Sequence, residues 1–186
     1  MKKIILAISG ASATTLAMKF LKEAQKSAEC YVILSNGAKL VAQKERGEDL
    51  RARIEELGVR VYEEEEMEAG VASGSFGVSA MAVIPTSMNT LAKIAYGIGD
   101  ELISRCACVM LKERKTLLLA PREMPLSPIA LENMSKLASL GVIIAPPILG
   151  YYSGAESLES MENFLVGKWL DVLGVENELY ERWRDR

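Results

Sequence analysis

The sequence contains no histidine among its 186 residues. Histidine-based catalytic triads and histidine-ligated metal sites are therefore excluded, and acid–base chemistry is left to Glu, Asp, Lys or Tyr. Only three cysteines are present, Cys30, Cys106 and Cys108. Their number and spacing match neither a disulfide framework nor a CxxC motif, which indicates reduced thiols that pack as small apolar side chains.

Long hydrophobic runs and a strong charge imbalance are also missing. The apolar residues 4–8 follow two lysines, but the run is too short for a signal peptide and a Gly/Ser turn follows it at once, so we expect a buried strand. No stretch reaches the length of a membrane span. The formal net charge of −3 gives no reason to expect nucleic-acid binding. These features predict a cytoplasmic protein without a membrane or nucleic-acid partner.

Short Ile/Val/Leu runs alternate with helical patterns along the chain. The runs predict strands at residues 4–8, 30–34, 59–62, 81–84 (ending at Pro85), 116–120 and 142–145. Helices are predicted at 14–24, 39–43, 48–57, 89–95, within 100–113, and at 127–140 and 158–173. Buried strands alternating with helices predict one α/β domain over 1–186, a Rossmann-like or flavodoxin-like three-layer sandwich with a mainly parallel sheet. Ligands of such folds bind at the carboxyl ends of the strands.

The turn Gly10-Ala11-Ser12 follows the first predicted strand and precedes a helix. Glycine lets the backbone approach a ligand closely, and a helix N-terminus offers free amides to an anion. The same residues would also make an ordinary turn with Ser12 as the helix N-cap. Residues 35–37, 73–75 and 85–90 carry similar hydroxyls and small side chains. We expect all four segments at one edge of the sheet, as a polar cradle for a phosphorylated cofactor.

Charged residues flank the predicted strand 116–120. For Glu113, Arg114 and Lys115, which precede it, a solvated surface is favoured, as it is for the acidic run 63–66. Arg122 and Glu123 follow the strand, where α/β proteins place their sites, and a carboxylate beside cations there fits a general acid or base. Residues 146–152 contain two prolines and two tyrosines, which indicate either a rigid turn with packing aromatics or the mouth of a pocket.

Taken together, these segments resemble the UbiX-type flavin prenyltransferases, flavoproteins once described as aromatic acid decarboxylases. The resemblance runs nearly end to end and is carried by residues 8–12, 73–76, 111–114, 121–126, 146–147, 152 and 182–183. It implies transfer of a dimethylallyl group from dimethylallyl monophosphate to N5 and C6 of reduced FMN, without a metal. It further implies a dodecamer with sites at subunit junctions, and a product that serves UbiD-type decarboxylases.

The resemblance also assigns roles to individual residues. Contacts to FMN would come from Gly10, Ala11, Ser12, Ser35, Ser87, Met88, Asn89, Thr90 and Arg105. The prenyl phosphate would be held by Lys112, Arg122, Tyr152 and Lys168, with Trp183 helping to close the pocket. Glu123 would donate a proton to the leaving phosphate, and Glu45 with Ser12 would transfer protons beside the flavin ring. Cationic side chains suit this reaction because they neutralise the leaving group without a metal.

Two positions depart from the family pattern. Ala13 stands where glycine is usual, and we expect a minor effect, on the condition that its backbone is helical. Lys168 stands where arginine is usual, keeps the charge and loses the bidentate fork, so the preferred prenyl donor stays open. Two alternatives remain: a non-catalytic FMN-binding module, and an FMN-dependent cysteine decarboxylase. Residues 85–89 loosely resemble the Pro-x-x-x-Asn signature of the latter, which is disfavoured because those enzymes use a histidine.

Overall fold

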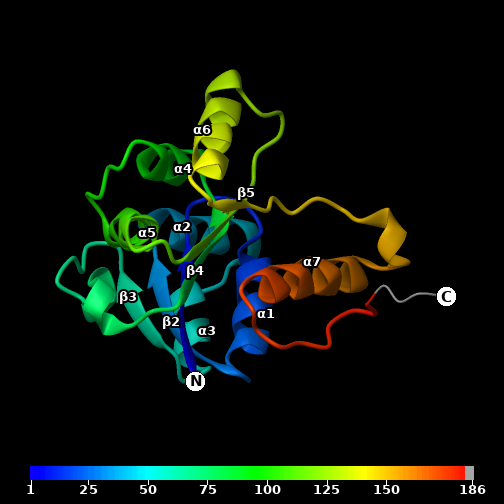
Figure 1. Ribbon diagram of the computed structural model, residues 1–186. Coiled ribbons are helices and arrows are strands. Elements are labelled where there is room, and N and C mark those ends of the chain that lie inside the picture. The colour runs from blue at the N-terminus through cyan, green and yellow to red at the C-terminus, as the bar shows by residue number, and fades with distance from the viewer. Residues whose placement is uncertain (183–186) are drawn as a thin grey trace.

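Residues 1–182 are described by the computed structural model, which places six strands in one parallel sheet between layers of helices (Figure 1). The strands are β1 (Lys2–Ile8), β2 (Ala28–Leu34), β3 (Arg60–Glu63), β4 (Ala80–Thr86), β5 (Thr116–Pro121) and β6 (Ile143–Ile144). The helices are α1 (Thr14–Ala24), α2 (Asn36–Arg46), α3 (Leu50–Glu55), α4 (Met88–Ala95), α5 (Leu102–Lys112), α6 (Pro128–Ser139) and α7 (Leu158–Val172). The predicted flavodoxin-like α/β fold is confirmed.

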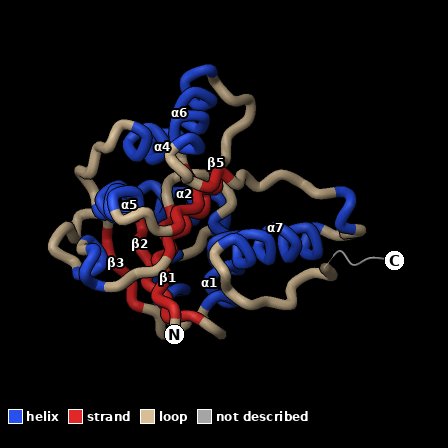
Figure 2. The backbone as a smooth tube through the Cα atoms, in the orientation of Figure 1, coloured by secondary structure: helices blue, strands red, loops and turns tan. Residues whose placement is uncertain are grey.

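The sheet separates two hydrophobic cores. In β1, Ile4, Leu6 and Ile8 point into the core that α1, α2, α3 and α7 cover, while Ile5 and Ala7 point into the core under α4 and α5. All five side chains are fully buried. Burial on both faces explains why β1 is a continuous apolar run instead of an alternating one. The helices stand on both sides of the red strands in Figure 2.

Strand β4 continues beyond the point where the sequence predicts its end. Pro85 lies inside the strand, next to last, although it has no amide hydrogen to donate to a neighbour. The pairing with β5 shifts register between Val83 and Thr86, so the irregular step falls at Pro85. Its carbonyl oxygen accepts from Ser9 N at 3.3 Å. The expectation that the strand stops at Pro85 is therefore wrong, because a register shift accommodates the proline.

The strand order β3-β2-β1-β4-β5-β6 reverses direction between β1 and β4. The helices that follow these two neighbouring strands pack on opposite faces of the sheet, and α/β proteins with this arrangement bind ligands in the crevice beyond the carboxyl ends of the two strands. We call this side of the sheet the carboxyl edge and the opposite side the amino edge. The loops that follow β1, β2, β4 and β5 begin at the carboxyl edge, as parallel pairing requires.

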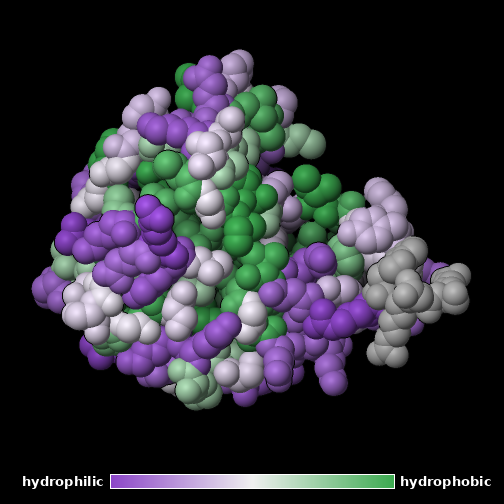
Figure 3. Space-filling model, viewed as in Figure 1, coloured by the Kyte–Doolittle hydropathy of each residue, from purple (hydrophilic) through white to green (hydrophobic). Residues whose placement is uncertain are grey.

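Helix α6 and the segment 145–157 extend away from the body of the molecule (Figure 1). Of the residues of α6, only Ala130, Asn133 and Leu137 are buried. Large exposed apolar side chains stand in 124–131 and 148–158, namely Met124, Leu126, Ile129, Leu131, Ile148, Leu149, Tyr151, Tyr152 and Leu158. Figure 3 shows apolar residues reaching the surface in a band across this face. In the described part of the chain, no helix is both long and apolar enough to cross a membrane.

Candidate functional site

The turn after β1 packs against the start of α2. A Cβ atom built on Gly10 would stand 3.0 Å from Cα of Gly37, so the two backbones are in close contact. Ser35 ties the loops further, because its amide donates to Ile8 O at 3.1 Å. Its Oγ accepts from Ala38 N at 3.0 Å and caps α2. The structure thus brings Gly10 and Ser35 together at the carboxyl edge, where the sequence predicts them.

Ser9 joins this turn to the start of α4. Its Oγ donates to Pro85 O at 2.9 Å and accepts from Ser87 N at 2.8 Å. The side chain is only 1% exposed, so both bonds are shielded from water. Ser87 in turn caps α4, with its Oγ accepting from Thr90 N at 3.2 Å. Sequence reasoning gave Ser9 no role of its own, although a hydroxyl at the end of a fully apolar strand is a signal that it has a partner.

Ala13, rather than Ser12, is the N-cap of α1, and it makes no side-chain cap. Its φ of 82° and ψ of 34° lie in the left-handed region. The expectation of a helical backbone at this position is therefore wrong, and the substitution of the usual glycine is not minor. An L-residue with a Cβ costs roughly 1–2 kcal/mol in this conformation. The family's glycine fits because the turn needs this geometry to enter α1.

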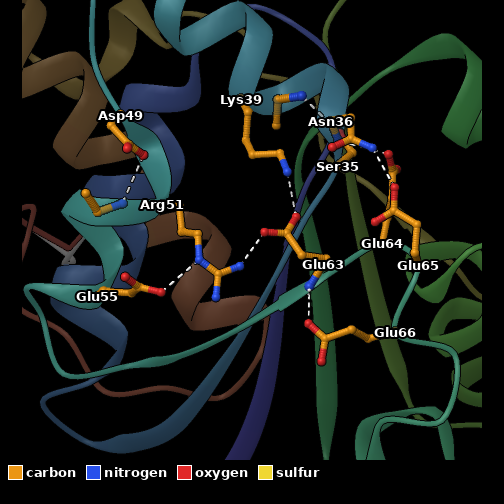
Figure 4. A network of polar contacts seen from close by, with 12 residues as sticks. Ser35, Asn36, Lys39, Asp49, Arg51, Glu55, Glu63, Glu64, Glu65 and Glu66 are labelled. Carbon is orange, nitrogen blue, oxygen red and sulfur yellow. Dashed lines mark hydrogen bonds and ion pairs between the residues drawn. The ribbon is translucent and has the colours of Figure 1, made fainter.

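The N-termini of α2 and α4 differ in their charge surroundings. In α2, Asn36 N donates to Glu64 Oε1 at 2.9 Å, and Asn36 Nδ2 donates to Glu65 Oε1 at 2.6 Å (Figure 4). Burial raises the pKa of Glu64, and the neighbouring carboxylates of Glu101 and Glu65 raise it further. An anion at this helix end would meet carboxylates. At the start of α4 the recorded acceptors are instead the Ser9 and Ser87 hydroxyls, so α4 is the better phosphate site of the two.

Arg122 and Glu123 follow β5 at the same edge. Arg122 N donates to Thr86 O at 3.1 Å. Thr86 is fully buried and fixes this junction, because its Oγ1 accepts from Ala120 N at 3.0 Å and donates to Val83 O at 2.7 Å. Both charged side chains are exposed, and Glu123 Oε1 accepts from Met124 N at 2.9 Å. The structure therefore places this cation–carboxylate pair one strand away from the Ser87 cap.

Arg105 and the two predicted phosphate ligands from the C-terminal part are also exposed. Arg105 lies in the first turn of α5, whose Leu102 N donates to Glu64 O at 2.7 Å at the end of β3. Tyr152 lies in the short 3-10 turn Tyr151–Ser153, with its ring 5.5 Å from that of Phe164 on α7. Lys168 is one helical turn further along α7. Trp183 lies outside the described residues.

The chemistry of this edge fits a phosphate ester beside a planar ring. Hydroxyls, the first turn of α4 and a guanidinium provide donors, and the Gly10–Gly37 contact leaves no side chain between the two loops. A flavoprotein family model matches residues 1–168. The flavin prenyltransferase UbiX of Helicobacter pylori strain J99 is 50% identical over 183 residues, covering 97% of this chain and 98% of the relative.

The chain belongs to the UbiX flavin prenyltransferase family.

Solved structures of family members have the same fold. The AnUbiX (PadA1) complex with FMN and dimethylallyl pyrophosphate is 36% identical, with a TM-score of 0.91, covering 100% of this chain and 98% of that one. A dodecameric, FMN-dependent UbiX-like decarboxylase from Escherichia coli O157:H7 is 35% identical, with a TM-score of 0.92, covering 98% and 100% of the two chains.

Two residues that the family resemblance assigns to the site stand apart from it within one chain. Lys112 ends α5 just before β5, at the amino edge, whereas Arg122 follows the other end of β5. The length of this strand separates them by about 20 Å. Glu45 is in the last turn of α2, about 12 Å along the helix from Gly37. A single copy of this chain therefore brings neither side chain to the carboxyl ends of β1 and β4.

Residues 73–75 do not line the carboxyl edge. Lys115 Nζ donates to Gly74 O at 3.4 Å, and Ser79 N donates to Lys3 O at 2.9 Å near the start of β1. Both partners belong to the amino edge, so the expectation of a fourth loop in the polar cradle is wrong. The crossover from β3 returns to the amino edge before β4 begins, and these residues lie at the end of that return.

The acidic run 63–66 is more than a solvated loop. Glu63 ends β3, and its carboxylate pairs with Lys39 Nζ at 2.7 Å and with the Arg51 guanidinium (Figure 4). Burial alone would raise the pKa of Glu63, but hydrogen bonds from the two cations outweigh it and lower the pKa. Among residues 1–182, no group of three Cys, Asp or Glu side chains is placed to hold a metal ion.

Proposed function

We propose that this protein transfers a dimethylallyl group from dimethylallyl monophosphate to N5 and C6 of reduced FMN. The observation that supports this proposal is that three features lie at the carboxyl edge of the sheet. They are the Gly10–Gly37 contact, the start of α4, and the neighbouring residues Arg122 and Glu123. The proposal includes the single domain and cytoplasmic location predicted above, and delivery of prenylated FMN to a UbiD-type decarboxylase.

Binding of FMN is divided between the loops after β1, β2 and β4, with Arg105 added from α5. Gly10, Ala11, Ser12 and Ser35 would lie along the flavin ring, where the absence of bulky side chains lets the backbone approach it. The FMN phosphate would lie at the start of α4, on Ser87, Met88, Asn89, Thr90 and Arg105. Glu64, which follows β3 and accepts from Asn36 N at the start of α2, supports this choice, because its carboxylate would repel a phosphate bound there. Reduced FMN supplies the nucleophilic atoms of the reaction when bound.

Cleavage of the donor requires charge neutralisation at its phosphate. Arg122, Tyr152 and Lys168 would bind this group, so that the bond from the allylic carbon to the phosphate oxygen breaks with the negative charge stabilised. Glu123 would then give its proton to the departing phosphate. Ser12 and Glu45 would move the proton lost from the flavin ring. Trp183 would help to exclude water.

Assembly would complete the site. Lys112 and Glu45 stand far from the crevice of their own chain, so we propose that they reach the crevice of a neighbouring copy. The exposed apolar side chains of 124–131 and 148–158 provide surface for such contacts. A dodecamer, as in the Escherichia coli relative, is the proposed state.

A mass spectrum of the flavin tests the proposal. The protein is incubated with FMN, dithionite and dimethylallyl monophosphate, and the mass of the extracted flavin is compared with the mass of FMN. We expect one added prenyl unit; recovery of unmodified FMN with intact donor would contradict the assignment. A parallel incubation with dimethylallyl diphosphate determines the phosphate preference, since the AnUbiX complex contains the pyrophosphate.

Glu123→Gln separates the enzyme from a non-catalytic FMN-binding module. The substitution should lower the prenylation rate by roughly 10²–10⁴-fold, the usual contribution of a general acid, and leave the dissociation constant of FMN unchanged. Glu132→Gln, an exposed carboxylate on α6, is the matched control and should keep full activity. Equal rates for both variants would remove Glu123 from this role.

A further inference from the structure

The chain after α7 folds back onto the helix and is held there by Asp171. Arg182 donates to both carboxylate oxygens of Asp171, at 2.9 and 2.8 Å. Asn177 Nδ2 donates to the same carboxylate at 2.9 Å, and the Tyr180 hydroxyl donates to it as well. Four hydrogen bonds from three residues thus converge on one side chain. We call residues 173–182, with these bonds, the tail latch.

The tail latch reaches the proposed phosphate ligand Tyr152 through a stack of aromatic rings. The Tyr180 ring packs edge-on against Phe164 at 5.1 Å, and Phe164 packs edge-on against Tyr152 at 5.5 Å. Phe164 is almost fully buried, while Tyr152 is 72% exposed. An exposed ring gains a fixed position from such a buried neighbour. The stack therefore connects the tail to the far side of α7.

Two glycines make this packing possible. A Cβ atom on Gly167 would stand 2.4 Å from Cδ1 of Tyr180, and one on Gly150 would stand 2.8 Å from Cε1 of Phe164. Neither glycine has a left-handed φ, so the requirement is for space and not for backbone freedom. Gly167 lies directly before Lys168, the second proposed phosphate ligand. The tail thus contacts α7 at Gly167, the residue before Lys168.

The charges of the tail latch are matched at neutral pH. Burial alone would raise the pKa of Asp171, but hydrogen bonds from Arg182, Tyr180 and Asn177 outweigh it and hold the pKa below its ordinary value. Burial and the hydrogen bond to Asp171 raise the pKa of Tyr180 to about 12. Asp171 is therefore an anion and Tyr180 a neutral donor, the states that their hydrogen bonds require.

We infer that Asp171, Phe164 and Tyr180 are positioning residues that hold Tyr152 and Lys168 in place for the phosphate of the prenyl donor. This inference rests on the proposed function, which gives those two side chains their ligand. Fixing both ligands before binding removes conformational entropy that the donor would otherwise have to overcome. Among the described residues, the side-chain hydrogen bonds and ring contacts of the latch reach none of the loops after β1, β2 and β4, to which FMN is assigned.

Gly167→Ala and Asp171→Asn test the inference from two directions. The first adds one methyl group where the Tyr180 ring packs, although alanine is the better helix former. The second removes the charge that Arg182 binds. Both should weaken binding of dimethylallyl monophosphate about tenfold, as expected for a lost charge-assisted contact. The dissociation constant of FMN should stay within about twofold. Glu162→Gln, which breaks the α7 ion pair with Lys19 Nζ, is the control and should change neither.

Affinity is measured by calorimetry with oxidised FMN present, so no turnover is needed. Trypsin cleavage after Arg182, followed by mass spectrometry without ligands, reports the tail itself and should be about fivefold faster in both variants. Faster cleavage with unchanged donor affinity would overturn the positioning role, and unchanged cleavage would overturn the latch. Failure of the unmodified chain to prenylate FMN would instead refute the proposed function, which these two measurements do not use.

Discussion

Gly10 and Gly37 pack backbone against backbone at the carboxyl edge, so closely that a Cβ atom on either would make an unusually tight contact. The Cβ of a residue at position 10 would lie 3.0 Å from Gly37 Cα and 3.2 Å from its carbonyl carbon. Both neighbours are backbone atoms, which cannot rotate away as a side chain can. This contact fixes the spacing of the loops after β1 and β2, and with it the proposed place of the flavin ring.

Gly10→Ala should therefore destabilise the protein by about 1–3 kcal/mol, the usual range for overpacking a close contact. The loops must also separate, so FMN affinity should fall about tenfold when about 1.4 kcal/mol of the strain is lost from binding. Urea denaturation and a flavin fluorescence titration measure the two effects. Gly99→Ala is the control, because its Cβ would meet Arg105 Cα at an ordinary 3.5 Å. Equal behaviour of the two variants would contradict the packing argument.

Ala13→Gly should stabilise the protein. Glycine relieves the strain of the left-handed conformation, which adds roughly 1–2 kcal/mol to the free energy of unfolding. Its greater conformational freedom in the unfolded chain lowers the free energy of unfolding by about 0.4–1 kcal/mol. The expected net gain is about 0.5–1 kcal/mol in the free energy of unfolding. Ala11→Gly, two residues earlier and without a positive φ, should only lose stability. A loss of the same size in both variants would mean that Ala13 is not strained.

Glu64→Gln should raise the melting temperature at neutral pH. Burial and the nearby carboxylates of Glu101 and Glu65 raise the pKa of Glu64 in the folded protein. A carboxyl group whose pKa is raised in the folded protein favours folding at pH values below its pKa in the unfolded chain. This contribution is lost as the pH rises through the pKa of the folded protein. The gain from glutamine should therefore be largest near pH 7 and shrink toward pH 4. Glu68→Gln, at an exposed carboxylate of the same loop, is the charge-matched control against which the change is measured.

The framework of the fold follows from the sequence because its signals are local. Residues 4–8 and 14–24 form the predicted strand and helix, since a buried parallel strand is apolar throughout and an amphipathic helix repeats every 3.6 residues. The same logic places Ser35 and Ser87 as helix caps at strand ends. Pro85 shows the limit, because a register shift between two strands leaves no mark in either sequence.

The site depends more on contacts between distant residues. Residues 73–75 have the same small, hydroxyl-bearing composition as residues 35–37. Composition does not say where along a crossover connection a segment lies, and residues 73–75 lie at its far end. The hydrogen bond from Asn36 N at the start of α2 to the Glu64 carboxylate joins residues 28 positions apart. Asp171 belongs to no motif of the sequence, because its partners come together only where the tail folds back on α7. Likewise, a motif gives residue types and no φ, so the strain at Ala13 could not be predicted.

The separation of Lys112 from Arg122 makes the last prediction one about shared sites. If Lys112 acts in a neighbouring crevice, a Lys112→Ala chain still has an intact Glu123, and a Glu123→Gln chain still has an intact Lys112. Two inactive variants, co-expressed with different tags and purified in tandem, should then form some complete sites. Random mixing would restore activity at about a quarter of the sites of a symmetric assembly.

Co-expression of an Arg122→Ala chain with a Glu123→Gln chain provides the control. These two neighbours serve the same crevice, so every crevice in the mixed assembly has one of them substituted. Prenylation is followed by the mass of the flavin, and the stoichiometry of the tags checks that mixed assemblies formed. Activity in the first pair and none in the second is the expected result. No recovery in the first pair, with mixing verified, would mean that Lys112 does not contribute to a neighbour's site. The chain would then have to bind the donor phosphate with Arg122, Tyr152 and Lys168 alone.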